Sequence, residues 1–110
     1  MSHNVTEIQD NGFDQAIANG VVLADFWAPW CGPCRMQGPI LEQVSADIGG
    51  AASIIKINVD ESPDTAGRFG VRSIPTLILF KDGKPVAQFV GLQRKEAIIS
   101  AIKSCVTAAN

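Results

Sequence analysis

Two strand-length stretches of the chain are almost uniformly apolar. Residues 21–27 and 53–59 each carry a single charged side chain, Asp25 in the first and Lys56 in the second. Continuous apolar runs of this length are typical of strands buried on both faces of a parallel sheet. Residues 4–8 form a shorter and weaker candidate strand near the start of the chain.

The last two apolar stretches of strand length are close together. Residues 76–80 and 86–90 lie on either side of the turn Lys81-Asp82-Gly83-Lys84. Because Asp-Gly between two apolar runs is a strong hairpin signal, the sequence predicts an antiparallel pair of strands here.

Turn and cap residues mark two short helices. Asp10-Asn11-Gly12 opens the first, and Asn19-Gly20 closes it. The second begins at Ser62-Pro63-Asp64, where serine is the expected cap and proline the first helical residue, and it ends near Gly70.

Apolar residues at helical spacing mark two longer helices. The first runs from the cysteine motif to Gly49-Gly50, and Pro39 inside it predicts a kink. The second begins near Arg94. The apolar positions are Met36, Ile40, Leu41, Val44 and Ile48 in the first helix and Ala97, Ile98, Ala101, Ile102 and Val106 in the second.

The order strand, helix, strand, helix, strand, helix, hairpin, helix predicts an α/β fold. Strand–helix–strand connections in a parallel sheet are right-handed, so we expect helices on both faces of a mixed sheet. The 110 residues contain no repeat and no internal linker, and residues 1–110 are expected to form one domain.

Composition and charge narrow the possible functions. The chain has 18% charged residues, a net charge of −2 and no basic run, so we expect no nucleic-acid partner. No apolar run is long enough to span a membrane, and residues 1–20 contain no Lys or Arg and therefore no secretory signal. Three cysteines leave one unpaired if two of them bridge, which favours a reducing compartment. We expect a monomeric, cytoplasmic protein.

The candidate chemistry lies in Trp30-Cys31-Gly32-Pro33-Cys34, between an apolar run and a long helix. Residues three apart share one helix face with Cβ atoms about 5–6 Å apart, whereas a disulfide needs about 3.5–4.5 Å, so a small adjustment converts dithiol to disulfide. Gly32 lets another backbone approach, and Pro33 suits a first helical turn. The helix start favours a thiolate at Cys31, the attacking species. We expect the Cys31 sulfur to be exposed and the Cys34 sulfur to be covered.

The run Asp25-Phe26-Trp27-Ala28-Pro29-Trp30-Cys31-Gly32-Pro33-Cys34, followed downstream by Ile74-Pro75-Thr76, resembles the thioredoxin family. The resemblance covers essentially the whole chain. It implies the thioredoxin fold, a central mixed five-stranded sheet, parallel except for a C-terminal antiparallel hairpin, with four helices on its two faces. It also implies a general protein-disulfide reductase, in which Cys31 attacks a substrate disulfide and Cys34 resolves the mixed disulfide.

Electrons must reach this pair from another protein. The sequence lacks the dinucleotide fingerprint G-x-G-x-x-G, so it does not hold NADPH itself. The resemblance implies no bound cofactor, a flavin-dependent thioredoxin reductase that passes on electrons from NADPH, and disulfide-containing proteins as acceptors. Two alternatives stay open. One is a disulfide isomerase or oxidase of the same fold, for which Gly-His between the cysteines would be typical, and the other is a non-catalytic binding subunit.

A zinc site is the other use for two neighbouring cysteines. Zinc usually takes four nitrogen or sulfur ligands, but the chain has only three cysteines and one histidine, with Cys105 and His3 near its ends. We therefore expect no metal. Cys105 is most simply a small buried apolar residue, with a regulatory role as the weaker alternative, and His3 is expected in a disordered terminus.

Asp25 interrupts an apolar strand, where a carboxylate is costly unless it is paired or protonated. One interpretation is a structural contact with Lys56. The other is catalytic: burial raises the pKa of Asp25, which then takes the proton from Cys34, while Lys56 tunes the acid. Thioredoxins carry an acid at this position, which favours the catalytic role.

The resemblance also implies a substrate-binding surface. Pro75 would be trans on base rates, but the resemblance implies a cis bond beside the cysteines, with hydrogen bonds from the backbone of Ile74 to the substrate. Gly91 either keeps this surface open or is a plain strand-end glycine. Trp30 is expected on the surface and Trp27 in the core. The expected binding residues are Trp30, Gly32, Pro33, Ile74, Pro75 and Gly91.

The sequence departs from the family pattern at Gly38, where a larger residue is usual. Glycine lowers helix stability by roughly 1 kcal/mol relative to alanine. We therefore expect this helix to bend more than those of its relatives.

Overall fold

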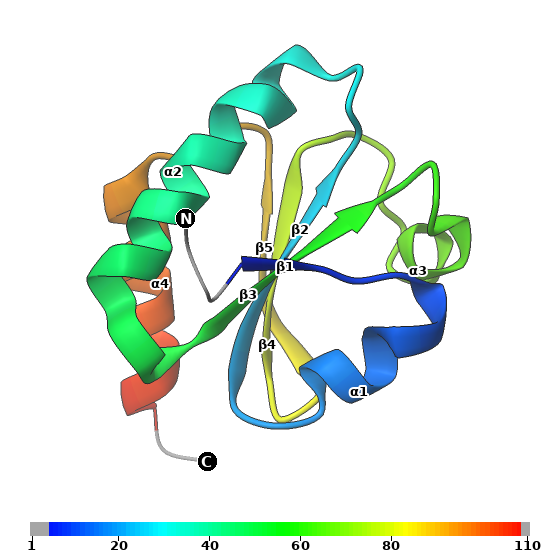
Figure 1. The fold of residues 1–110 in the computed structure, drawn as a ribbon. Helices are drawn as coiled ribbons and strands as arrows, with labels where there is room; N and C mark the ends of the chain where they lie inside the picture. The colour runs from blue at the N-terminus through cyan, green and yellow to red at the C-terminus, as the bar shows by residue number, and fades with distance from the viewer. Residues whose placement is uncertain (1–4, 109–110) are drawn as a thin grey trace.

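The computed structural model describes residues 5–108, and its centre is a five-stranded sheet (Figure 1). The strands are β1 (Val5–Glu7), β2 (Val21–Trp27), β3 (Ser53–Asn58), β4 (Thr76–Lys81) and β5 (Lys84–Val90). Their order across the sheet is β1-β3-β2-β4-β5. β1, β3 and β2 run parallel, whereas β4 is antiparallel to β2 and β5 is antiparallel to β4. The predicted mixed sheet is therefore confirmed.

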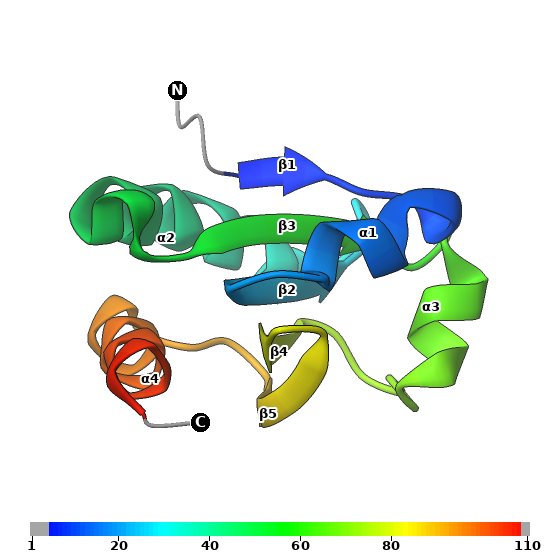
Figure 2. The same cartoon turned by 90° about the horizontal axis from the view of Figure 1, so that it is seen from below.

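Helices cover both faces of this sheet. In the described part of the chain these are α1 (Phe13–Ile17), α2 (Gly32–Ile48), α3 (Pro63–Arg68) and α4 (Lys95–Thr107), with short 3-10 turns η1 (Asp10–Gly12) and η2 (Gly49–Ala51). Figure 2 shows α2 and α4 together on one side of the sheet and α1 and α3 on the other. Within residues 5–108, no helix is both long enough and apolar enough to cross a membrane.

Strand β2 lies in the middle of the sheet and contributes to two separate cores. Val22, Ala24 and Phe26 pack with residues of α1 and α3, whereas Leu23 packs with residues of α2 and α4. Successive side chains of a strand point to opposite faces, so Asp25 points to the same face as Leu23. A strand covered on both faces needs apolar residues at nearly every position, which explains the continuous run in the sequence.

Two residues of the predicted apolar helix faces lie on the surface. Met36 in α2 is 60% exposed and Val106 in α4 is 41% exposed, whereas Leu41 and Ile102 are fully buried. Helical spacing therefore identified each buried face but extended it too far at one end. Helix α2 continues through Pro39 to its predicted end.

Ser62 is the N-cap residue of α3 and Pro63 is its first residue, as predicted, but the Ser62 side chain makes no capping hydrogen bond. The Ser62 hydroxyl is buried and has no hydrogen-bond partner among the described residues. Instead, the Asp10 carboxylate accepts hydrogen bonds from the backbone N–H groups of Asp64 (3.2 Å) and Thr65 (2.9 Å) and from the Thr65 hydroxyl (2.6 Å). These hydrogen bonds, the Thr65 hydroxyl first, lower the pKa of Asp10. A residue distant in sequence thus satisfies the free donors of this helix start.

The predicted hairpin is confirmed. Asp82 and Gly83 both have positive φ angles, 50° and 86°, as the turn that best fits a two-residue hairpin loop requires. The register of the two strands shifts between Leu79 and Phe80.

Candidate active site

The two cysteines lie where β2 leads into α2. Cys31 is the extended N-cap residue of the helix, and Pro33 lies in its first turn, as the sequence predicts. A disulfide joins Cys31 and Cys34, whose Cα atoms are 5.2 Å apart. The strand and the helix hold both residues, so the pair has a fixed position on the rigid part of the fold.

The backbone N–H of Cys34 points at the sulfur of Cys31. It donates a hydrogen bond to Cys31 Sγ over 3.2 Å. This N–H is one of the free donors of the helix start, where the helix dipole also favours negative charge. Both features favour negative charge at the position of Cys31 Sγ, so the geometry distinguishes the two sulfurs.

The expected contrast in exposure between the cysteines is wrong for the disulfide form. Cys31 is only 6% exposed, close to the 4% of Cys34. Both pack with buried Ala28 and against Val59 and Ile74. A partner protein would therefore mainly meet Gly32 and Pro33, which lie between the cysteines and are exposed.

Two loops close around the cysteines. The Ile74–Pro75 peptide bond is cis, and the carbonyl oxygen of Ile74 lies 3.7 Å from Cys31 Sγ. Pro75 is buried, and its carbonyl accepts a hydrogen bond from the N–H of Gly91 over 2.8 Å. The structure therefore brings Cys31, Ile74, Pro75 and Gly91 together from three separate parts of the chain.

Gly91 combines the two interpretations that the sequence leaves open. Its φ of 90° lies in a region that favours glycine, so the backbone itself requires this residue. A Cβ atom added to it would meet no atom within 4 Å, so the space beside it is also open.

Asp25 is fully buried beside β3. It lies opposite Lys56 in the parallel register, and neither of its carboxylate oxygens has a hydrogen-bond partner among the described residues. Burial raises its pKa to about 7; the positive charge of Lys56 opposes this shift and the negative charge of Glu7 adds to it. The direct structural contact with Lys56 that the sequence suggests is not formed.

Lys56 interacts with an aromatic ring instead. Its Nζ lies 4.2 Å from the centre of the Trp27 ring, and the Trp27 Nε1–H donates a hydrogen bond to Glu7 Oε2 over 3.2 Å. Glu7, Lys56 and Asp25 occupy one row across β1, β3 and β2. Partial burial is the main cause that raises the pKa of Glu7. Trp27 is thus half-buried over this row rather than fully in the core.

Trp30 lies on the surface, as predicted, with 66% of the residue exposed. Its Nε1–H donates a hydrogen bond to Asp60 Oδ2 over 2.9 Å. The indole is therefore held in one orientation while its faces stay available to a partner.

Gln37 and Glu7 were not predicted from the sequence as residues of the site. Gln37 is a fully buried polar side chain in α2, and its amide bonds the backbone of Gln93. For Gln37, the available signal was a polar residue one turn after Cys34, among apolar helical positions. For Glu7, the signal was an acid in the candidate strand at residues 4–8. Its place beside Lys56 and Asp25 follows only from the register of the strands.

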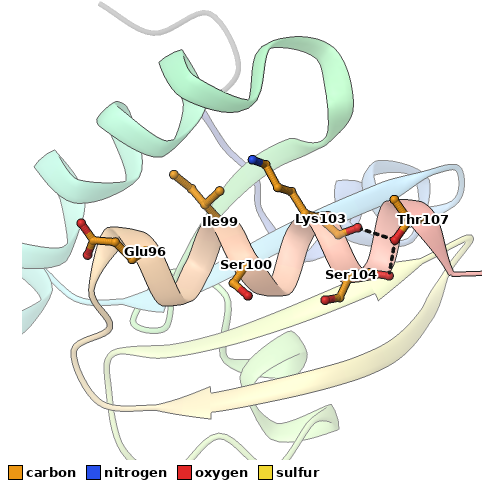
Figure 3. Close-up of a pocket in the computed structure, with 6 residues that line it drawn as sticks. All are labelled: Glu96, Ile99, Ser100, Lys103, Ser104 and Thr107. Carbon is orange, nitrogen blue, oxygen red and sulfur yellow. Dashed lines mark hydrogen bonds between the residues drawn. The ribbon is translucent and has the colours of Figure 1, made fainter.

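No group of three or more His, Cys, Asp or Glu side chains able to hold a metal ion occurs in residues 5–108. Cys105 is buried in α4 at 8% exposure, and His3 lies outside the described residues. Elsewhere, a shallow hollow of about 480 Å³ follows one side of α4 (Figure 3). All six of its lining residues come from this helix, and none is a cysteine.

Comparison with known proteins agrees with this geometry. The family model described as Thioredoxin matches residues 4–104. Thioredoxin from Staphylococcus saprophyticus is 52% identical over 99 residues, which cover 90% of this chain and 95% of that protein. Thioredoxin from Staphylococcus haemolyticus is 51% identical over 98 residues, with coverages of 89% and 94%. The solved structure of a mutant thioredoxin from Halobacterium salinarum superposes with a TM-score of 0.88 at 40% identity, covering 96% of this chain and 94% of that one.

Proposed function

The chain belongs to the thioredoxin family and is a protein-disulfide reductase with a redox-active Cys31–Cys34 pair, and we propose that Cys31 is the sulfur that attacks the substrate. The hydrogen bond from the Cys34 N–H to Cys31 Sγ is the observation on which this assignment rests. It favours negative charge on Cys31, and the thiolate is the nucleophile in thiol–disulfide exchange.

The reaction has two exchange steps. In the first, the Cys31 thiolate attacks one sulfur of the substrate disulfide, that bond breaks, and the other substrate sulfur leaves with the electron pair and takes up a proton. In the second, Cys34 loses its proton and attacks Cys31 Sγ, which releases the second substrate thiol. Two electrons and two protons have then passed to the substrate, and the Cys31–Cys34 disulfide has formed.

Asp25 is our candidate for the base that accepts the proton of Cys34. A pKa raised to about 7 allows an acid to take up and release protons near neutral pH, and neither carboxylate oxygen has another partner in the described chain. Lys56 opposes the rise in pKa and therefore tunes this base.

The substrate lies across the rim of the cysteine pair in this proposal. Trp30, Gly32 and Pro33 offer exposed surface on one side, and the loops that carry Ile74 and Pro75 and Gly91 border the other side. An extended substrate segment forms backbone hydrogen bonds with Ile74, as in a short strand addition.

Membership of the family implies disulfide-containing substrates and a reductase partner in general. We propose that the reductase is a separate flavoenzyme that takes electrons from NADPH, because the chain has no dinucleotide fingerprint. We also propose that the whole chain works as one monomeric domain without a bound cofactor in the cytoplasm, where Cys105 stays unpaired.

A comparison of Cys31→Ser with Cys34→Ser tests the assignment of the two sulfurs. Both variants should fail to reduce insulin at a measurable rate. Mass spectrometry of a mixture with a disulfide substrate should show a trapped mixed disulfide with Cys34→Ser alone, because only that variant keeps the attacking sulfur. A trapped adduct on Cys31→Ser instead would reverse the roles.

Insulin reduction and the reduction potential of the wild type separate the alternative functions. A non-catalytic binding subunit would show no insulin reduction even as the wild type. A disulfide isomerase or oxidase would show a reduction potential near the oxidising end of the range for this fold.

A further inference from the structure

Gln37 is a buried amide with two hydrogen bonds to a single residue. Its Nε2 donates to the carbonyl oxygen of Gln93 over 3.1 Å, and its Oε1 accepts from the N–H of Gln93 over 2.8 Å. The side chain has no exposed surface. Burial of an amide is unfavourable without such partners, and an apolar residue would fill this position of α2 without needing them.

The residue that Gln37 holds belongs to the segment 91–93, which together with Arg94 links β5 to α4. At its start, the N–H of Gly91 donates to the carbonyl oxygen of Pro75 over 2.8 Å. At its end, Gln93 is bound to Gln37, and its own side chain donates to the carbonyl oxygen of Gly91 over 3.2 Å. The segment is therefore fixed at both ends, to the proline loop and to the helix that carries Cys34.

The segment 91–93 and Val90 before it expose apolar side chains, and Gly91 bonds to the carbonyl of Pro75, which follows the Ile74 carbonyl beside Cys31 Sγ. Leu92 at its centre is 40% exposed, and Val90 just before it is 59% exposed. Exposed apolar side chains beside a reactive site are suited to hold apolar side chains of a partner. Their position relative to Cys31 depends on what anchors the segment.

We propose that Gln37 is a positioning residue that fixes the segment 91–93 for docking of protein substrates. The proposal rests on the proposed function, in which Gly91 borders the substrate-binding surface. The Gln37 side chain forms its hydrogen bonds with the segment, so it affects the affinity for large substrates. The reactivity of Cys31 depends on the hydrogen bond from the Cys34 N–H to Cys31 Sγ, in which the Gln37 side chain takes no part.

Gln37→Leu removes both hydrogen bonds while keeping a side chain of similar size. Gln37→Met also removes both hydrogen bonds, with an unbranched side chain closer in shape to glutamine, and Gln43→Leu is the control because Gln43 is exposed on the same helix. Each variant is assayed for insulin reduction and for reaction of its reduced form with Ellman's reagent, a small disulfide that needs no docking surface. Hydrogen exchange of the Gln93 amide reports directly on the hydrogen bond.

We expect Gln37→Leu to raise KM for insulin by about fivefold, the loss typical of one net hydrogen bond, with kcat and the rate with Ellman's reagent changed less than about twofold. Gln37→Met should behave like Gln37→Leu, Gln43→Leu should match the wild type, and the Gln93 amide should exchange faster in both Gln37 variants. If Gln37→Leu does not fold, the same measurements on Gln37→Met decide the matter.

Two results would overturn the proposal. One is faster exchange of the Gln93 amide with an unchanged KM for insulin. The other is an equal loss with insulin and with Ellman's reagent, which would mean that Gln37 acts on the cysteines. Failure of the wild type itself to reduce insulin would refute the proposed function instead, so the two failures are distinguishable.

Discussion

Asp25 lies opposite Lys56 on the neighbouring strand, yet no ion pair joins them and both Asp25 carboxylate oxygens lack a hydrogen-bond partner within the described residues. The Lys56 ammonium instead lies over the ring of Trp27. Glu7 stands on the other side of Lys56 in the same row. Lys56 therefore stabilises the charge of a buried acid from a distance, and does so only partly.

Asp25 should make the stability of the folded protein depend on pH. The pKa of Asp25 is about 7 in the folded protein and 3.8 as a model value, so between these values the unfolded chain releases a proton that the folded chain retains. Stability should therefore fall as pH rises from about 4 to about 7, by on the order of 4 kcal/mol from this group. Asp25→Asn removes the effect and should be more stable than the wild type above pH 7.

Urea unfolding of both proteins between pH 4 and pH 8 measures this difference. The gain from Asp25→Asn should shrink towards zero near pH 4, where Asp25 is protonated in both states. A difference that stays constant across this range would show that the Asp25 carboxyl does not titrate as its burial requires.

Asp25 should also set the rate of the resolving step, in which Cys34 attacks Cys31 Sγ. Loss of the base should lower kcat for insulin reduction by at least about tenfold in Asp25→Asn while KM stays the same. In the wild type, kcat should rise as pH increases through about 7, because the carboxylate form is the one that accepts the proton. Unchanged kcat near neutral pH in Asp25→Asn would exclude Asp25 as the base.

The third prediction concerns Glu7. Its negative charge raises the pKa of Asp25, so Glu7→Gln should move the midpoint of the kcat profile to lower pH. The Gln side chain still offers an oxygen to the Trp27 Nε1–H, so the local contact can persist. Glu61→Gln is the control, because Glu61 acts on Glu7 and is not among the groups that shift Asp25. A midpoint that moves to higher pH would contradict the assigned sign.

The fourth prediction concerns Gly38. A Cβ atom at this position of α2 would lie 4.0 Å from Lys56 Nζ, which is an ordinary contact. Gly38→Ala should therefore stabilise the protein by up to about 1 kcal/mol, the difference in helix propensity. Urea unfolding measures the gain, and insulin reduction should be unaffected. A lower unfolding midpoint would mean that Lys56 needs the space beside Gly38.

Most of the fold could be predicted from local patterns in the sequence. The β2 run matches its predicted bounds at 21–27 because a strand covered by helices on both faces has few tolerated polar residues. The hairpin turn at Asp82 and Gly83 follows from backbone angles that few other pairs adopt. Both signals depend only on neighbouring residues, which is why the sequence alone was sufficient.

The failures concern contacts between distant segments. Ser62 occupies the N-cap position of α3, but Asp10 accepts the hydrogen bonds of this helix start because η1 packs beside α3. The contact expected between Asp25 and Lys56 is replaced by the interaction with Trp27. In each case the side chain had several possible partners, and only the packed fold selects one.

Asp10 and Thr65 are 55 positions apart, and this distance has a consequence for how the chain folds. An isolated helix as short as α3 does not persist in water. Its first turn therefore depends on the Asp10 carboxylate, and the chain between the two must close a long loop to bring them together. We therefore expect α3 to form late, after the N-terminal region has docked. In a ribosome-bound nascent chain, the N-terminal half would therefore lack α3 until residues 63–68 had been synthesised and could meet Asp10.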